Sequence, residues 1–159
     1  MPRDKKLNLE RFKKSSHGLV EFATLIEQAD PTSQARILEQ AKEQDEEFVF
    51  HVMKRIVYFD ELVFLDEAVL AELLSKVSPK VLAFALVGAN PEFRDKMLRN
   101  LSLRDRRTFE DEADKMGNAN PAFTAGARKQ ILRAARRLEA ENKFVFEVTA
   151  APRHKKKAR

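Results

Sequence analysis

The side chains best suited to recognising a partner lie in one stretch, NLSLRDRRTFEDEADKMG, at residues 100–117. Arg104, Asp111 and Glu112 recur there at helical spacing with Thr108 and Lys115, so a helix would carry them as one ridge. Along this ridge the cation comes first and the carboxylates follow. Such a ridge is suited to binding complementary charges on a partner rather than to catalysis.

The rest of the sequence contains no recognisable catalytic or metal-binding pattern. There is no Cys, and no phosphate-binding glycine loop or Ser-His-Asp pattern is present. The histidines are far apart: His17, His51 and His154. Glu46-Glu47 and Asp60-Glu61 are neighbours that would point in different directions on a helix, which disfavours paired acid–base catalysis. We predict that the chain is not an enzyme and uses no catalytic residue, metal, cofactor or small-molecule substrate.

The sequence also predicts where the charged helix begins and ends. Ser102 is placed as an N-cap, with Asp105 three residues later, and Gly117 readily takes a left-handed conformation at a helix end. The apolar residues between these ends form a narrow stripe: Leu103, Phe109, Ala113 and Met116. We therefore expect a helix over 102–116 with the charged ridge on the side opposite this stripe.

Composition indicates a folded helical protein whose positive charge is concentrated at its ends. The 159 residues are 43% hydrophobic and 35% charged, with four Gly and six Pro. Residues 1–14 hold six Lys or Arg against two acids, and residues 153–159 hold five cations and no acid. The ends therefore carry +9, and the body −4, of the net charge of +5. Nucleic acid is not an expected partner of the body.

Neither secretion nor a membrane span is predicted. The N-terminus MPRDKKLNLERFKK has no apolar segment typical of a signal peptide, and no run of eighteen apolar residues occurs. The length allows one core or two small helical subdomains. We expect a cytoplasmic protein.

Helical periodicity extends over most of the chain. The expected helices cover residues 18–29, 31 to at least 41, 45–57, 66–75, 78–88, 90–98, 102–116 and about 124–142. Asp30, Ser78 and Asn90 each precede a proline and are predicted N-caps. The stretch NANPAFTAG at 118–126 is expected to form a loop. The helix that begins after Ser78 has little polar surface and is predicted to be central.

Residues 56–65, IVYFDELVFL, form an apolar stretch interrupted by Asp60 and Glu61. Its aromatic and β-branched residues are compatible with a strand, but no partner strand is evident nearby. We prefer a buried joint between two helical subdomains that leads into a short helical turn.

Several segments follow one another over residues 17–146: HGLVEFATLIEQADPTSQARILEQAKEQDEEF, IVYFDELVFLDEAVL, LAFALVGAN, RNLSLRDRR, DEADKMG and RKQILRAARRLEAENKFVF. In this order they resemble the C-terminal half of the flagellar motor switch protein FliG. The resemblance implies an all-α fold with right-handed helical stacking: an armadillo-like three-helix unit at 17–56, then a small six-helix domain at 57–146 that contains the charged helix 102–116. The basic segments 1–16 and 147–159 are expected to be flexible.

The resemblance also assigns roles to residues. The hinge that joins the two units in FliG falls on Ile56, Val57, Tyr58 and Phe59, of which only Phe59 keeps the aromatic residue of the family pattern. The torque helix of FliG carries its charges at the positions of Arg104, Asp111 and Glu112. These residues are therefore expected to face the cytoplasmic loop of a MotA-type stator protein.

Two positions depart from the family pattern. A lysine is expected where Val87 stands, and an arginine where Asn120 stands, so two cations that flank the ridge in FliG are missing. Losing two exposed charges is expected to weaken stator contact without abolishing it. The last helix, in contrast, concentrates cations: Arg128, Lys129, Arg133, Arg136 and Arg137. Arg136-Arg137 belongs to the family pattern and needs no special ligand.

Three functions stay open on the sequence alone. The first is a rotor module that contacts the stator for torque generation and switching, located peripherally at the cytoplasmic face of the flagellar basal body. The second is a stand-alone paralogue that regulates rotor assembly by binding full-length FliG or FliM. The third is a nucleic-acid or anionic-membrane adaptor that acts through the basic ends. Met1 and the lysine-rich ends favour a paralogue over an excised segment.

Overall fold

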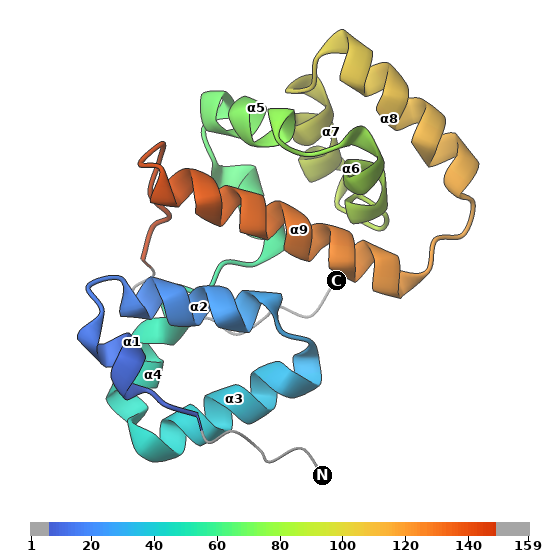
Figure 1. The fold of residues 1–159 in the computed structure, drawn as a ribbon. Coiled ribbons are helices and arrows are strands. Elements are labelled where there is room, and N and C mark those ends of the chain that lie inside the picture. The colour runs from blue at the N-terminus through green and yellow to red at the C-terminus, as the bar shows by residue number, and fades with distance from the viewer. Residues whose placement is uncertain (1–6, 149–159) are drawn as a thin grey trace. The chain divides into compact units, whose positions relative to one another are not determined.

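The computed structural model describes residues 7–148, which fold into helices joined by short connections (Figure 1). No β-strand occurs within this range, and the predicted all-α fold is confirmed. These residues divide into two compact units, one made of residues 7–57 together with 146–148, the other of Tyr58–Val145. Most of the basic tail expected at 147–159 and the first six residues lie outside the described range.

The first unit contains four helices in its described part. They are α1 (Glu10–Lys14), α2 (Gly18–Gln28), α3 (Pro31–Gln44) and α4 (Glu46–Met53). As predicted, Asp30 caps α3 by accepting a hydrogen bond from the Ser33 N–H at 2.9 Å. Phe22 and Ala23 of α2 are fully buried, which places the core of this unit between α2 and its neighbours.

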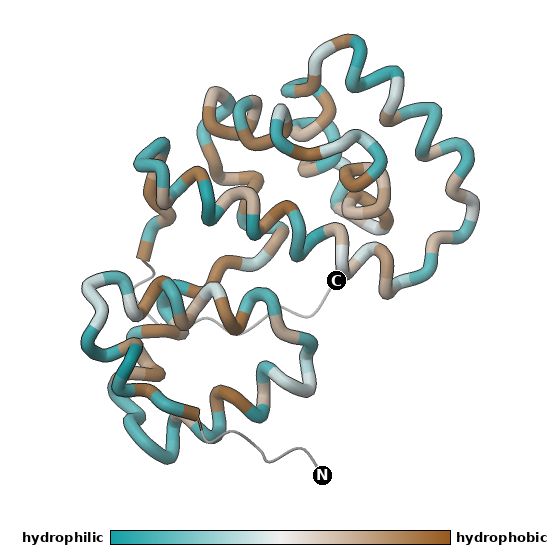
Figure 2. Tube along the Cα trace, viewed as in Figure 1, coloured by the Kyte–Doolittle hydropathy of each residue, from teal (hydrophilic) through white to brown (hydrophobic). Residues whose placement is uncertain are grey.

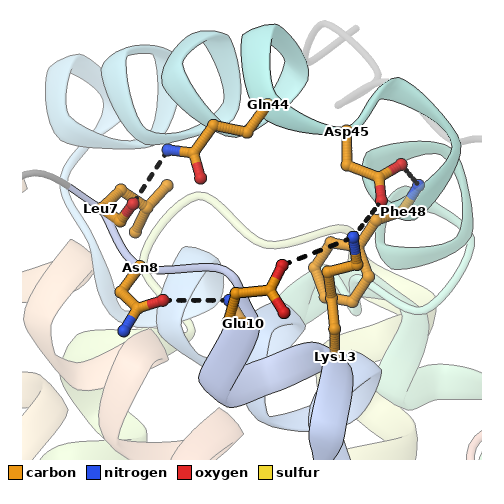
Figure 3. A network of polar contacts seen from close by, with 7 residues as sticks. All are labelled: Leu7, Asn8, Glu10, Lys13, Gln44, Asp45 and Phe48. Carbon is orange, nitrogen blue, oxygen red and sulfur yellow. Dashed lines mark hydrogen bonds and ion pairs between the residues drawn. The ribbon is translucent and has the colours of Figure 1, made fainter.

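The expectation that residues 1–16 are flexible is wrong for the part that the structure describes. Leu9 is only 2% exposed, and Phe12 of α1 packs edge-on against Phe22 with ring centroids 5.0 Å apart. Figure 3 shows two polar contacts that hold this segment on α3 and α4: the Gln44 amide donates to the Leu7 carbonyl at 2.8 Å, and Lys13 lies 2.7 Å from Asp45. The many lysines and arginines concealed the apolar pair Leu9 and Phe12, which share one helical face.

Asp45 makes the stability of this unit depend on pH. The Lys13 ammonium and then the Phe48 N–H, which the carboxylate caps at 3.0 Å, hold the pKa of Asp45 below its ordinary value. A carboxyl group whose pKa is lower in the folded than in the unfolded state stabilises the fold at pH values above its pKa in the unfolded state. This stabilisation is lost as the pH falls through the pKa of the folded state. The first unit should therefore lose stability below about pH 4.

The substitution Asp45→Asn tests this expectation, because Asn retains the N-cap and removes the charge. We expect the difference in melting temperature between pH 7 and pH 3 to be smaller in this variant than in the unaltered chain. Glu43→Gln, at an exposed position of α3, is the matched control and should leave the difference unchanged. If the melting temperature of Asp45→Asn depended on pH as strongly as that of the unaltered chain, Asp45 would not be the source of the pH dependence.

The second unit, Tyr58–Val145, is described throughout. It consists of the 3₁₀ helix η1 (Phe59–Phe64) and five α-helices: α5 (Glu67–Ser75), α6 (Pro79–Ala85), α7 (Pro91–Arg99), α8 (Leu103–Met116) and α9 (Pro121–Ala140). The short helix α6 packs against both α8 and α9, and Figure 1 shows it between them. Its residues Leu82, Ala83 and Ala85 are buried, so its predicted central position is confirmed.

Two predicted helix boundaries and the predicted burial of the joint need correction. The last helix begins at Pro121 rather than near Thr124, because Asn120 caps it by accepting from the Ala122 N–H at 2.8 Å. The helix expected over 45–57 ends at Met53. The joint at 56–65 leads into a helical turn as expected, but it is not buried throughout, since Phe64 is 83% exposed.

Candidate charged interaction site

The charged helix α8 has the ends that the sequence predicts. The Ser102 hydroxyl accepts a hydrogen bond from the Asp105 N–H at 3.1 Å, which satisfies one of the free donors at the helix start. Gly117 follows the last helical residue with φ +57°, a conformation that side chains rarely adopt. The start of α8 is thus fixed by a side-chain cap, and its end is marked by a glycine with positive φ.

A single large side chain, Phe109, fixes α8 on the core of its unit. Phe109 is 1% exposed, and the Arg94 guanidinium of α7 lies over its ring, 5.3 Å from the centroid. The predicted inclusion of Leu103 in the apolar stripe is wrong, since Leu103 is 68% exposed. At about 100° per residue, Leu103 lies roughly 120° around the helix from Phe109 and so faces solvent.

Of the charged ridge, Arg104, Asp111 and Glu112, the first two lie on the side of α8 that faces away from Phe109, and Glu112 lies nearer to the buried side. Arg104 and Asp111 are exposed, whereas Glu112 is half-buried. The difference follows from helix geometry, since Glu112 lies about 60° from Phe109 and Arg104 about 140°. Figure 2 shows the hydrophilic colour along most of α8, in contrast to α6. Arg104 and Asp111 therefore form an accessible polar surface, and Glu112 lies at its edge.

In the described part of the chain, the side chains of the charged ridge form no ion pair and no hydrogen bond. The pair formed on α8 is Arg106 with Glu110 at 3.6 Å, one helical turn apart and about 100° or more around the helix from Arg104 and Asp111. An exposed pair of this kind contributes about 0.2–1 kcal/mol, so it does little to fix the surface. The charges at 104, 111 and 112 can therefore meet a partner without first breaking an internal contact.

The two positions where flanking cations were expected have other roles in this fold. Asn120 is the N-cap of α9. The carbonyl of Val87 accepts a hydrogen bond from the Arg128 guanidinium at 2.9 Å. Arg128 also donates to the Ala85 carbonyl at 2.8 Å, so it satisfies the carbonyl groups at the end of α6.

Arg128 is a residue whose role the sequence did not predict. Besides its two carbonyl contacts, its guanidinium lies over the ring of Phe59, 5.1 Å from the centroid. It thus connects α9 with α6 and η1 within the second unit. The only signal in the sequence was its place among the cations of the last helix, which gives no hint of these partners.

The four predicted hinge residues lie at the border between the two units, which falls between Val57 and Tyr58. Val57 donates its N–H to the buried carboxylate of Glu27 in α2 at 2.9 Å. Phe59 packs edge-on against Phe93 of α7, with ring centroids 5.1 Å apart. Val57 and Phe59, on either side of Tyr58, are therefore each fixed within their own unit.

Within residues 7–148, no group of three or more His, Asp or Glu side chains could hold a metal ion. None of the helices in this range has the length and apolar character needed to cross a membrane.

Residues 39–146 match the family model of the FliG C-terminal domain. The flagellar motor switch protein FliG of Thermotoga maritima is 27% identical over 129 residues, which cover 81% of this chain and 38% of that protein. FliG of Vibrio cholerae is 29% identical over 121 residues, covering 76% of this chain and 35% of the relative. The chain thus spans less than two fifths of the length of these relatives.

Solved structures of FliG share the fold. The crystal structure of FliG residues 86–343 from H. pylori aligns with 84% of this chain and 63% of that one, with a TM-score of 0.61 and 22% identity. Full-length FliG from Aquifex aeolicus aligns with 80% of this chain and 40% of that one, with a TM-score of 0.53 and 22% identity.

Proposed function

This chain belongs to the FliG C-terminal domain family, and from that membership we propose that it is a flagellar rotor module that presents α8 to the stator. The match over residues 39–146 includes the whole of α8. The observation that carries the proposal is the accessible ridge of Arg104, Asp111 and Glu112, which no residue of the described chain neutralises. A surface so displayed supports recognition of charge rather than chemical conversion of a substrate.

The proposed partner is the cytoplasmic loop of a MotA-type stator protein with complementary charges. Exposed charge pairs are individually weak, at about 0.2–1 kcal/mol, which suits a partner that slides past and must be released. The contact should weaken as salt rises, because the Debye length falls from about 10 Å at 0.1 M to about 3 Å at 1 M. We place the module peripherally at the cytoplasmic face of the flagellar basal body.

The border between the units supports a change in their orientation as part of this function. Val57 is held to the first unit through Glu27, and Phe59 to the second through Phe93. Reorientation would then be taken up by the backbone around Tyr58, between these two fixed residues. In this proposal Ile56–Phe59 acts as the hinge that lets the second unit turn α8 toward or away from the stator.

A second candidate function is regulation of rotor assembly by binding full-length FliG or FliM. The first unit favours it, because Leu25 of α2 and Phe50 of α4 are 41% and 44% exposed. Large apolar side chains at the surface are common at protein–protein interfaces, although single ones also occur on ordinary surfaces. This function would depend on the first unit and not on the charged ridge.

Reversing the charge at the two carboxylates of the ridge distinguishes the two candidate functions. We expect Asp111→Lys combined with Glu112→Lys to abolish or strongly reduce swimming in a strain whose motility depends on this chain, at unchanged protein abundance. The control Glu39→Lys with Glu43→Lys makes the same change in net charge at exposed positions of α3 and should leave swimming intact. Normal swimming of the ridge variant would refute the stator-contact function and leave the regulatory one.

A further inference from the structure

The 3₁₀ helix η1, which begins at the last hinge residue, is held within the second unit by cations from two other helices. Its first residue, Phe59, lies under the Arg128 guanidinium of α9, 5.1 Å from the ring centroid. At its other end, the Lys96 ammonium of α7 donates to the carbonyls of Val63 and Leu65, the latter at 2.9 Å. A 3₁₀ helix has poorer hydrogen-bond geometry than an α-helix, so η1 depends on such outside contacts to keep its shape.

The Arg128 guanidinium joins the Phe59 ring to the end of α6. Its Nε–H donates to the Ala85 carbonyl at 2.8 Å, and its Nη2 donates to the Val87 carbonyl at 2.9 Å. A planar guanidinium directs its donors from fixed positions, so it can bind two carbonyls and still lie over a ring. A lysine ammonium is a point charge on a flexible stem and would not fix these three partners relative to one another.

The Phe59 ring is connected to the charged helix α8 by two sets of contacts. Through Arg128 the ring is joined to α6, and α6 packs against α8. The ring also packs edge-on against Phe93 of α7, and the adjacent Arg94 lies over Phe109, the large buried side chain of α8. The last residue of the hinge is therefore linked to the helix that carries the charged ridge.

We propose that Arg128 is a positioning residue that makes the second unit turn as one body about the hinge. This inference rests on the proposed hinge at Ile56–Phe59 and adds the contact that fixes its far end. With the Phe59 ring held on α6, a change in the backbone at Tyr58 moves α8 together with the rest of the unit. Without that contact η1 gives way first, and the turn of the hinge reaches α8 only in part.

Distances between two spin labels on the full chain, measured by pulsed electron paramagnetic resonance, test this role. The sequence contains no Cys, so Glu39→Cys on α3 and Asp114→Cys on α8 place one label on each unit at exposed positions. We expect Arg128→Gln to widen the distribution of distances between the labels, and Arg128→Lys to widen it less. Arg137→Gln removes the same charge from an exposed position of α9 and is the matched control, which should leave the distribution unchanged.

Hydrogen–deuterium exchange and a second variant identify the contact that is responsible. The amide hydrogens of η1 should exchange about tenfold faster or more in Arg128→Gln than in the unaltered chain, because the contact at its first residue is lost. Phe59→Leu keeps an apolar side chain but removes the ring, so it should also widen the distance distribution. Combining Phe59→Leu with Arg128→Gln should add little further width, since both changes remove the same contact.

The proposal is overturned if the distance distribution of Arg128→Gln is as narrow as that of the unaltered chain, or if Arg137→Gln widens it equally. If circular dichroism shows that Arg128→Gln does not fold, Arg128→Lys takes its place, and an unchanged width in that variant overturns the proposal as well. Full additivity of the Phe59 and Arg128 variants would contradict a shared contact. None of these measurements includes the stator, so their failure would leave the stator contact untouched, and loss of the stator contact would leave them unchanged.

Discussion

Replacing Phe109 with alanine should lower the free energy of unfolding of the second unit by about 3–5 kcal/mol. Phe109 is 1% exposed and is the large buried side chain of α8. Its removal would leave a cavity beneath the helix and would also take away the ring under the Arg94 guanidinium. Thermal and urea denaturation of the full chain, followed by circular dichroism, would measure the loss.

Leu103→Ala provides the matched control on the same helix. Leu103 is 68% exposed, so its truncation should change stability by less than about 0.5 kcal/mol. The contrast matters for function, since the charged ridge depends on a helix held mainly by one aromatic residue. If Phe109→Ala cost less than about 1 kcal/mol, α8 would be held by other contacts and this account of its attachment would be wrong.

The second large effect is expected in the first unit, at Gly18. A Cβ atom on this residue would lie 1.5 Å from the carbonyl oxygen of Phe12 and 2.5 Å from its carbonyl carbon. Backbone atoms cannot yield as a flexible side chain can, so Gly18→Ala should force α1 away from α2 and expose Phe12. We expect a loss of about 3 kcal/mol in the free energy of unfolding, together with faster proteolysis near the N-terminus.

Gly126→Ala is the control for this substitution. Apart from its chain neighbours and the local helix backbone, nothing lies within 4 Å of the added Cβ, and alanine is the better helix former. Stability should therefore stay equal or rise by up to about 1 kcal/mol. Equal behaviour of the two variants would show that the close approach of α1 to Gly18 does not persist in solution.

The elements with strong local signals were predictable from the sequence. Ser102 caps the start of α8 and Gly117, with its positive φ, marks the end. Both signals involve only residues close to the helix end, so they can be recognised in the sequence. The Asp30-Pro31 pair marks the start of α3 for the same reason. The central place of α6 followed from its nearly unbroken apolar composition.

The features that were missed depend on weaker or competing signals. Asn120-Pro121 has the same cap-and-proline form as Asn90-Pro91, but the surrounding Asn, Ala and Gly residues favoured a loop. The helix α1 was obscured by its lysines and arginines, since two buried residues, Leu9 and Phe12, suffice to attach it. Leu103 was assigned to the core by composition although helical geometry turns it outward.

The outward position of the ridge residues could be predicted from the sequence, but the contacts of the residues around them could not. Helical spacing alone places Arg104 and Asp111 on one outward face. The contacts of Arg128 with the carbonyls of Ala85 and Val87 join residues about forty positions apart, and such distant partners leave no periodic signal in the sequence.

Binding of the full chain to the cytoplasmic loop of a MotA-type stator protein tests the central claim most directly. Biolayer interferometry at low and high salt would compare the unaltered chain with Asp111→Lys combined with Glu112→Lys, and with the α3 control Glu39→Lys combined with Glu43→Lys. The account predicts weak, salt-sensitive binding that the ridge variant loses and the control retains. Binding that is insensitive to salt and unchanged in the ridge variant would contradict it.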